Sequence, residues 1–309
     1  MSASSFNKGS AATPLDKKKI VVFGTGGYLG ACAYGFLQRA GSLYGTGISG
    51  VGAPRAIVAT ASGSKNLNSI LSQNFALAQA DESFIRPTDV MDAENIQAKI
   101  NGFDAAIIGT RYCYKTLPVT MGTFAKGPND KTREFYLDQP RTPGSKLLDD
   151  SEYSSAIFSN TLEACKKSNT LNHLVIVETD AEFDDEYVGD KYLQLLEESE
   201  IPYTYIRPLG KMDNIKNFTF KRGIQSDLKI ARANSVEDFL SVEDKKIYRE
   251  HVAAVCVQCL MTLEWKDNRV IQVEQSAEDL DYTPSRKDKS QKEWCMNSGI
   301  IMNALAGIP

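Results

Sequence analysis

The sequence is poor in histidine and has no long apolar run, and each shortage excludes a class of function. The only histidines are His173, which precedes an apolar strand pattern, and His251, which begins a helical one. Neither has a Cys, Ser or carboxylate placed to form a metal site or a nucleophile pair, so we interpret both as structural. No stretch approaches the ~18 consecutive apolar residues that cross a bilayer, so we expect no membrane span.

The sequence also lacks an excess of basic residues. The 35 Lys and Arg residues are outnumbered by 39 Asp and Glu, which gives a formal net charge of −4 at pH 7. A surface that binds nucleic-acid phosphates needs clustered Lys and Arg. We therefore expect no nucleic-acid partner.

Cysteine is sparse and scattered rather than dense, which is typical of a chain in a reducing compartment. Cys256 and Cys259 form a C-x-x-C pattern, but the surrounding "HVAAVCVQCLMTL" has helical periodicity, and the sequence offers no second pair for a metal. We interpret both as buried structural thiols. The remaining cysteines are Cys32, Cys113, Cys165 and Cys295.

The N-terminal segment has no apolar core of a secretory signal. We expect residues 1–18 to form a disordered tail. Their Ser, Ala and Lys content also fits the end of a trimmed organelle-targeting segment. The expected location is soluble and intracellular, either cytoplasmic or in an organelle stroma or matrix such as that of a plastid.

Strand-like and helix-like segments alternate along the chain from Lys19. Continuous apolar strands, each followed by a helix, predict an α/β fold with a doubly wound parallel sheet covered on both faces. Strands are expected over 19–25, 54–62, 83–90, 103–110, 173–180, 203–208 and 269–275. Helices are expected over 28–40, 93–100, 151–169, 191–200 and 249–263.

Two regions depart from this alternation. Residues 111–149 are rich in Pro and Gly, which predicts an irregular loop within a core that spans residues 19–208. After Pro208 the pattern loosens, so residues 209–309 are expected to form a smaller substrate-capping region and a C-terminal tail. The tail carries Trp294, Ile300, Ile301 and Leu305 on one helical face, which favours a helix docked on its own domain.

Three glycines at a spacing of three, Gly24, Gly27 and Gly30, lie between the first strand and the first helix. In this context the turn is typical of a dinucleotide site. Gly24 permits the tight turn, Gly27 lets the backbone approach a pyrophosphate, and Gly30 lets the helix lie close to the strand. The helix N-terminus presents free N–H groups to the phosphates. The whole predicted turn comprises Gly24, Thr25, Gly26, Gly27, Tyr28, Leu29 and Gly30.

The end of the second strand indicates which dinucleotide binds. An NAD site usually has an acid there for the ribose hydroxyls, but no acid occurs between Arg55 and Gln73. Ser62, Ser64 and Lys65 are available instead, which favours NADP over NAD. After the third strand, Asp89 and Val90 are placed to contact the adenine, although an ordinary helix N-cap explains Asp89 equally well.

These features in order, with "GFDAAIIG", "HLVIVET", "SEIPYTYIRP" and "IYREHVAAVCVQCL", resemble the atypical short-chain dehydrogenase/reductases, particularly their NmrA-like NAD(P)-binding group. The likeness covers about residues 19–275 and implies a Rossmann-like fold. It implies a nicotinamide near the ends of the fourth and fifth strands, flanked by Gly109 and Thr110. Arg207 and Pro208 would lie at the mouth of the site. The group contains reductases, isomerases, sensors and assembly factors on one fold.

Catalysis in such enzymes commonly uses Y-x-x-x-K, and "YVGDK" supplies Tyr187 and Lys191. On one helix face, Lys191 would hold the ribose and lower the pKa of Tyr187, which would donate a proton to a carbonyl oxygen. Thr179 would supply the hydroxyl that the family places after the fifth strand. The neighbouring acids, including Glu178, and the short spacing from Thr179 instead favour a solvated loop that holds Tyr187 away from the cofactor.

Two functions follow from these alternatives. The first is an NADP-dependent oxidoreductase acting on a small-molecule carbonyl or an activated double bond. The second is a non-catalytic NADP-binding scaffold, redox sensor or assembly factor that docks on a protein complex. The partner is accordingly a small-molecule substrate or a protein complex.

Overall fold

The structure is a computed structural model of the chain. It describes residues 18–25, 28–44, 56–61, 85–88, 92–109, 150–178, 189–214, 228–232, 246–275 and 305. The expected irregular loop at 111–149 and nearly all of the expected N-terminal tail lie outside these residues. Lys18 is described, and its Nζ lies 3.6 Å from Oδ1 of Asp104.

One large sheet runs through the molecule, with the strand order β3-β2-β1-β4-β5-β6-β10-β8. All neighbouring strands in it are parallel except β8, which is antiparallel to β10. The eight strands are β1 (Lys19–Val22), β2 (Ala56–Ala61), β3 (Ile85–Pro87), β4 (Ala105–Gly109), β5 (His173–Val177), β6 (Tyr203–Pro208), β8 (Leu228–Arg232) and β10 (Arg269–Gln275). The chain therefore has the doubly wound α/β fold that the sequence predicts.

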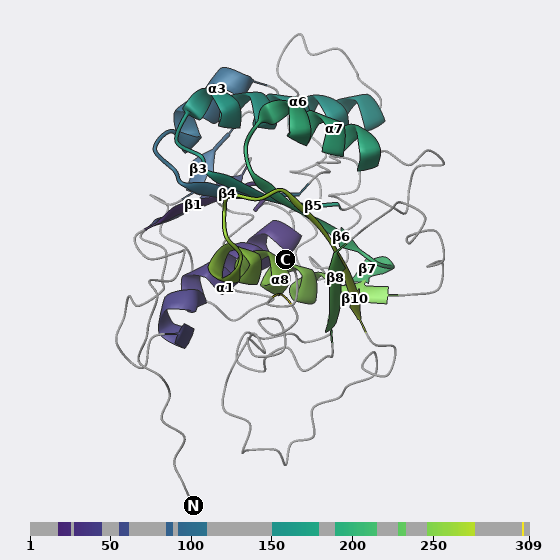
Figure 1. Cartoon of the computed structure of the whole chain (residues 1–309). Helices are drawn as coiled ribbons and strands as arrows, with labels where there is room; N and C mark the ends of the chain where they lie inside the picture. Colours follow the sequence, from purple (N-terminus) through teal and green to yellow (C-terminus); the bar gives the residue numbers. More distant parts are fainter. Residues whose placement is uncertain are drawn as a thin grey trace, which may run out of the picture.

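Helices cover both faces of this sheet (Figure 1). On one face lie α1 (Tyr28–Tyr44) and α8 (Arg249–Thr262), which pack against each other. On the other face lie α3 (Ala93–Ile100), α6 (Asp150–Ser168) and α7 (Gly189–Ser199). The sheet thus separates two apolar cores, one under each group of helices.

The sequence of β5 shows why both faces must be covered. All five residues of His173–Val177 are buried, and successive side chains of a strand point to opposite faces. Val175 and Val177 contribute to the core that contains α1 and α8. Leu174 and Ile176 contribute to the core that contains α3, α6 and α7. A strand buried on both faces reads as a continuous apolar run, which is why it was predictable.

Helix α8 packs beside α1 on the same face of the sheet and is buried all round. Every residue from Glu250 to Met261 is buried, as expected of a helix that is apolar on all sides. Cys256 and Cys259 are both fully buried in it, which confirms the prediction of buried thiols. Leu305 is also buried in the core on the α1 and α8 side, as expected for a tail that docks on its own domain. Its expected companions on that helical face lie outside the described residues.

The chain beyond β6 forms a small ribbon and then returns to the main sheet. Gly210 has φ +112°, and the turn leads into β7 (Lys211–Asp213), which pairs in parallel with β9 (Lys246–Tyr248). The following helix and strand, α8 and β10, belong to the main layers. The described residues within 209–309 therefore supply a ribbon at the end of β6 and part of the central core, while the capping role of 209–309 stays a prediction.

No described helix has the length and apolar composition that crossing a bilayer requires.

Candidate functional site

The turn between β1 and α1 has the backbone geometry that only glycine accommodates easily. Gly24 has φ +70°, a left-handed conformation that strains other residues. A Cβ on Gly30 would lie 2.5 Å from the carbonyl oxygen of Gly24 and 2.7 Å from its carbonyl carbon. The first turn of α1 therefore lies directly against the end of β1, which requires glycine at Gly30.

This turn lies at the point where the direction of strand connection reverses. From β1 the chain proceeds outward through β2 and β3, then crosses to β4 on the other side of β1. Ligands of open α/β sheets bind at such a point, beyond the carboxyl ends of the strands. Phe23 N donates a hydrogen bond of 2.9 Å to Ile107 O, so the end of β1 stays joined to β4. Gly109 ends β4 and is partly exposed.

Tyr28, the first residue of α1, turns its side chain into the protein. Its hydroxyl donates a hydrogen bond to Oε1 of Glu250 in the first turn of α8. Tyr28 is 6% exposed and Glu250 is 0% exposed. Burial and the Glu250 carboxylate raise the pKa of Tyr28 well above its ordinary 10.0, so the phenol stays protonated. This hydroxyl is therefore a structural donor at the edge of the glycine turn.

A buried ion pair joins the carboxyl ends of β5 and β6. Nε of Arg207 lies 3.1 Å from Oε2 of Glu178, and the two side chains are only 4% and 10% exposed. The guanidinium also lies 5.4 Å from the ring centroid of Tyr205. Both charges face one another at the edge where the resemblance implies a nicotinamide. Glu178, which the sequence analysis treats only as an unfavourable neighbour of the predicted dyad, thus has a partner within the core.

The structure describes only part of the predicted site. Gly24, Thr25, Tyr28, Leu29 and Gly30 cluster at the β1–α1 turn, while Gly109 and Pro208 end β4 and β6. The other predicted residues lie outside the described part of the chain, and their roles stay predictions. They are Gly26, Gly27, Ser62, Ser64, Lys65, Asp89, Val90, Thr110, Thr179 and Tyr187.

The predicted Tyr187–Lys191 dyad depends on where α7 begins. This helix begins at Gly189, so Lys191 is its third residue and Tyr187 precedes it by two positions. Tyr187 lies outside the described residues, so the shared helix face expected of residues four apart stays a prediction for this pair. The pairing of Tyr187 with Lys191 stays a prediction that depends on the segment before the helix.

Both histidines are buried in hydrogen-bonded positions. Nε2 of His173 lies 3.0 Å from Oγ1 of Thr204, and burial lowers the pKa of His173 from 6.5 to about 4. Nδ1 of His251 lies 2.9 Å from Oε1 of Gln275. Among the described residues no group of three or more His, Cys, Asp and Glu is arranged to hold a metal. The structural interpretation of the two histidines agrees with this geometry.

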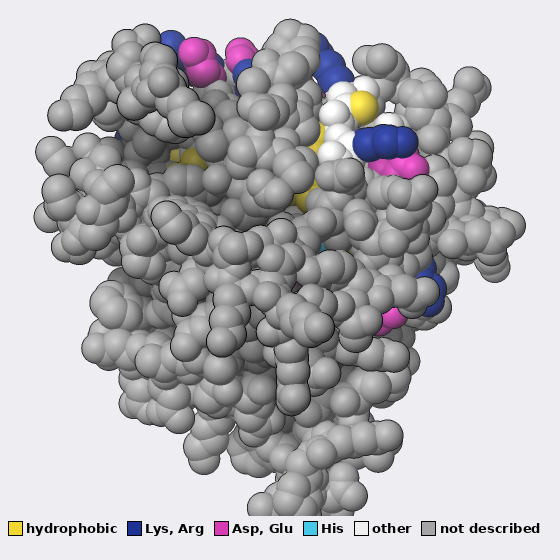
Figure 2. All heavy atoms as spheres, turned by 90° about the horizontal axis from the view of Figure 1, so that it is seen from below, with side chains coloured by type: hydrophobic (Ala, Val, Ile, Leu, Met, Phe, Trp, Pro, Cys, Tyr) yellow, Lys and Arg dark blue, Asp and Glu magenta, His cyan; other side chains and the backbone are white. Residues whose placement is uncertain are grey.

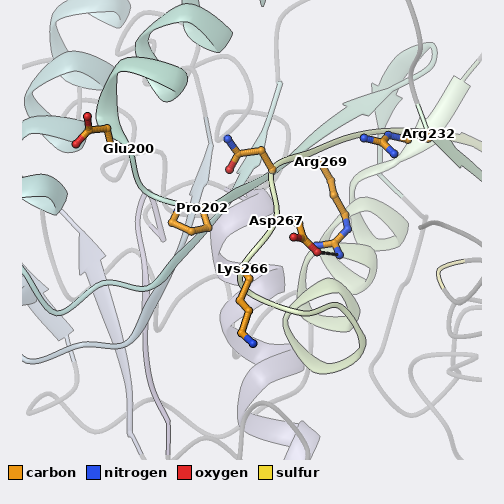
Figure 3. A pocket seen from close by; sticks show the side chains of 7 residues that line it. Glu200, Pro202, Arg232, Lys266, Asp267 and Arg269 are labelled. Atoms are coloured by element: carbon orange, nitrogen blue, oxygen red, sulfur yellow. Dashed lines mark hydrogen bonds and ion pairs between the residues drawn. The ribbon is translucent and has the colours of Figure 1, made fainter.

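A hollow of about 570 Å³ lies at the opposite edge of the sheet, beside the amino ends of β6 and β10 (Figure 3). Its lining is mainly polar and includes Arg232, Lys266 and Arg269. The Arg269 guanidinium already has protein partners, because it donates to Asp267 Oδ2 at 2.6 Å and to Glu264 O at 2.8 Å. Lys266 and Glu200 point in different directions in Figure 3. We therefore take the carboxyl edge as the candidate site.

The described surface carries charges of both signs. On the face shown in Figure 2, the basic side chains lie close to acidic ones, and the described residues there form no broad basic patch.

Comparisons with known proteins identify the fold. No family model and no curated protein matches the sequence. The structure is similar to a Rossmann-fold NAD(P)-binding family protein from Shigella flexneri, with a TM-score of 0.52 and 13% identity over 86% of this chain and 98% of that chain. The chain therefore has a Rossmann-like fold.

Weaker similarities include two cofactor complexes. One is a Citrobacter sp. triphenylmethane reductase complexed with NADP(H), with a TM-score of 0.43 and 13% identity over 94% of this chain and 84% of that chain. The other is NmrA, a negative transcriptional regulator in complex with NAD, with a TM-score of 0.37 and 10% identity over 63% of this chain and 46% of that chain.

Sequence reasoning missed the contribution of Glu250 to this region. The residue lies 222 positions from Tyr28, and an acid in the first turn of a helix is ordinarily a solvated residue that complements the helix dipole. The one available signal is the apolar sequence that follows, "HVAAVCVQCLM", which predicts a helix buried all round. A carboxylate at the start of such a helix needs a partner inside the protein.

Proposed function

We propose that this chain binds a nicotinamide dinucleotide at the carboxyl edge of its sheet and acts as an NADP-dependent oxidoreductase on a small-molecule carbonyl or activated double bond. The observation that carries the binding half is the pairing of Gly24 with Gly30. A left-handed glycine at the end of β1 and a first helical turn in contact with it are the close strand-to-helix junction typical of a pyrophosphate site.

The residues that would hold the cofactor come from several strand ends. The N–H groups at the start of α1 would bind the pyrophosphate, and Ser62, Ser64 and Lys65 would bind the 2′-phosphate of NADP. Asp89 and Val90 would contact the adenine, while Gly109, Thr110 and Pro208 would flank the nicotinamide. When bound, the nicotinamide supplies or accepts a hydride. The absence of an acid between Arg55 and Gln73 is what favours NADP over NAD.

The proton-transfer half of the proposal rests on Tyr187 and Lys191. Tyr187 would donate a proton to the carbonyl oxygen, with Thr179 supplying a further hydroxyl. The Lys191 ammonium would favour the ionised phenol. Tyr28 is not a candidate for this step, because burial and Glu250 raise the pKa of its phenol and its proton is donated to Glu250.

A fluorescence titration tests the binding half. NADPH and NADH are titrated against the wild-type protein, against Gly27→Asp, and against Gly102→Asp as a matched control. Gly102 has φ +81°, and a Cβ there meets nothing within 4 Å. We expect NADPH to bind the wild type and Gly102→Asp alike, and to bind Gly27→Asp at least tenfold more weakly. Absent binding to the wild type, or equal binding to all three proteins, would refute the proposal.

The second candidate is an NADP-binding protein without turnover, such as a scaffold, a redox sensor or an assembly factor. The Glu178–Arg207 ion pair favours it, because a fixed charge pair lies next to Thr179, the position of the hydroxyl in oxidoreductases that this chain resembles. A panel of small carbonyl and enone substrates separates the two candidates. Turnover that falls at least a hundredfold in Tyr187→Phe, with NADPH affinity retained, supports the enzyme, while binding without turnover across the panel supports the second candidate.

A further inference from the structure

A side chain from the last third of the chain contacts, inside the protein, the residue that directly follows the glycine turn. Tyr28 begins α1 directly after Gly27, and its hydroxyl donates to the Glu250 carboxylate at the start of α8. Both side chains are buried. A side chain 222 positions away therefore contacts the first residue of α1.

Burial of the Glu250 carboxylate costs free energy that packing alone does not require. Glu250 is fully buried, and a carboxylate removed from water needs strong compensating interactions. The Tyr28 hydroxyl and the N-terminus of α8 both favour the charge. An apolar residue would fill the same space without that need, so the carboxylate at this position has a role besides packing.

The start of α8 is itself fixed from two other directions. Nη1 of Arg249 donates to Oδ1 of Asn214, at the end of β7, with a length of 3.2 Å. The backbone N of Tyr248 donates to Oε1 of Gln275 at 3.1 Å, and the His251 ring lies 2.9 Å from the same oxygen. Gln275 ends β10. The carboxylate is thus held at a fixed point on the carboxyl edge of the sheet.

We propose that Glu250 is a positioning residue of the dinucleotide-binding turn, acting through Tyr28. The inference rests on the proposed function, because it assigns Glu250 a role only if the turn binds a dinucleotide. By holding the Tyr28 hydroxyl, Glu250 sets the position of the first turn of α1 and of the N–H groups that face the pyrophosphate. The contacts of Arg249 and Gln275 connect the start of α8, and with it Glu250, to the ribbon of β7 and β9 and to the end of β10.

The test compares variants that alter this contact with one that alters a buried polar contact elsewhere. Tyr28→Phe removes the hydroxyl and keeps the ring, Glu250→Leu removes the acceptor, and Glu250→Gln keeps an oxygen that can accept from Tyr28. Thr204→Val is the matched control, because it removes the buried bond to His173 at the opposite edge of the sheet. Each protein is titrated with NADPH, and its apparent stability is measured by urea unfolding.

We expect Tyr28→Phe and Glu250→Leu to raise the Kd for NADPH about tenfold, as loss of a hydrogen bond to a charged group allows. The Kd of Glu250→Gln for NADPH should stay within about threefold of the wild-type value. The Kd of Thr204→Val should stay within about twofold, despite the lower stability of this variant. In the unliganded proteins, amide hydrogen exchange over residues 23–32 should be faster in Tyr28→Phe and Glu250→Leu than in Thr204→Val. If Glu250→Leu does not fold, Tyr28→Phe carries the test.

Two results would overturn the inference about Glu250 and leave the proposed function standing. One is a wild type that binds NADPH together with a Tyr28→Phe variant whose Kd is unchanged. The other is a Thr204→Val variant that weakens binding as much as Tyr28→Phe does. A wild type that binds neither NADPH nor NADH instead overturns the proposed function, and the role of Glu250 falls with it.

Discussion

Arg207 and Glu178 form an ion pair of 3.1 Å across the ends of two neighbouring parallel strands, with both side chains almost completely buried. The backbone supports the same junction, because Glu178 N donates to Ile206 O at 2.9 Å. The pair therefore fixes the β5–β6 end of the carboxyl edge, while the Tyr28–Glu250 contact fixes the α1–α8 side.

Removing one partner of this pair should destabilise the protein strongly. Arg207→Met leaves the Glu178 carboxylate buried without its cation, and such losses cost about 3–5 kcal/mol. Glu178→Gln should also destabilise, and the double variant should lose less than the sum of the two single variants. Urea unfolding of the four proteins measures the coupling free energy. Additive losses would show that the two side chains do not interact.

Gly30→Ala tests the close approach of α1 to β1. Alanine normally favours a helix interior, but its Cβ here would lie 2.5 Å from the Gly24 oxygen, so the helix must shift. We expect a loss of about 2 kcal/mol or more in the free energy of unfolding, as found for forced overpacking. Gly102→Ala, which meets nothing within 4 Å, should lose only the ~1 kcal/mol of a strained φ. Equal losses in the two variants would contradict the close approach.

His173 should make stability depend on pH between about 6.5 and 4. Burial lowers its pKa in the folded protein from 6.5 to about 4. Between these values the unfolded chain binds a proton that the folded protein does not, so stability falls as the pH is lowered. The contribution is complete above pH 6.5 and lost by about pH 4, with a maximum of about 3 kcal/mol for a shift of this size.

The measurement is urea unfolding at pH 7, 6, 5 and 4 for the wild type and His173→Gln. Carboxylates contribute acid sensitivity to both proteins, so the difference between the two curves isolates the histidine. We expect the difference to change progressively from pH 7 to pH 4. Parallel curves would mean that His173 titrates normally in the folded state.

The buried cysteines should resist thiol reagents while the protein is folded. Cys32, Cys165, Cys256 and Cys259 are all buried and free, and burial raises the pKa of Cys165, Cys256 and Cys259. Because the thiolate is the reactive form, both effects slow alkylation. Iodoacetamide followed by peptide mass spectrometry should label these cysteines only in denaturant. Rapid labelling of Cys256 or Cys259 in native buffer would show that α8 opens.

The sequence predicts the central strands well because their residues are buried on both faces. The runs around β1, β4, β5 and β6 are continuous and apolar, so their existence follows from composition alone. The glycine turn was predictable for a related reason, since its backbone conformation restricts the residue type at Gly24 and Gly30. These features are local, and each is determined by a few adjacent residues.

The features that escaped prediction depend on residues far apart in the chain. Strand β8 has a mostly exposed pattern because it lies at the edge of the sheet, and β7 and β9 have only three residues each. The partners of Glu178 and Glu250 come from other elements, so neither acid could be recognised as buried from its neighbours. The start of α7 at Gly189 rather than at the expected residue 191 is a boundary shift that local sequence does not determine.

The packing of α1 against α8 has a consequence for biosynthesis. The two helices cover the same face of the sheet. Helix α1 ends at Tyr44, whereas α8 ends only at Thr262, so the ribosome completes α8 long after α1. At ribosomal elongation rates, the time between synthesis of the end of α1 and of the end of α8 is on the order of ten seconds or more. Throughout it, the apolar face beneath the glycine turn lacks its second covering helix. The nascent chain must therefore remain in an incompletely buried state until α8 has been synthesised, and truncation before α8 should yield an aggregating product rather than a smaller stable domain.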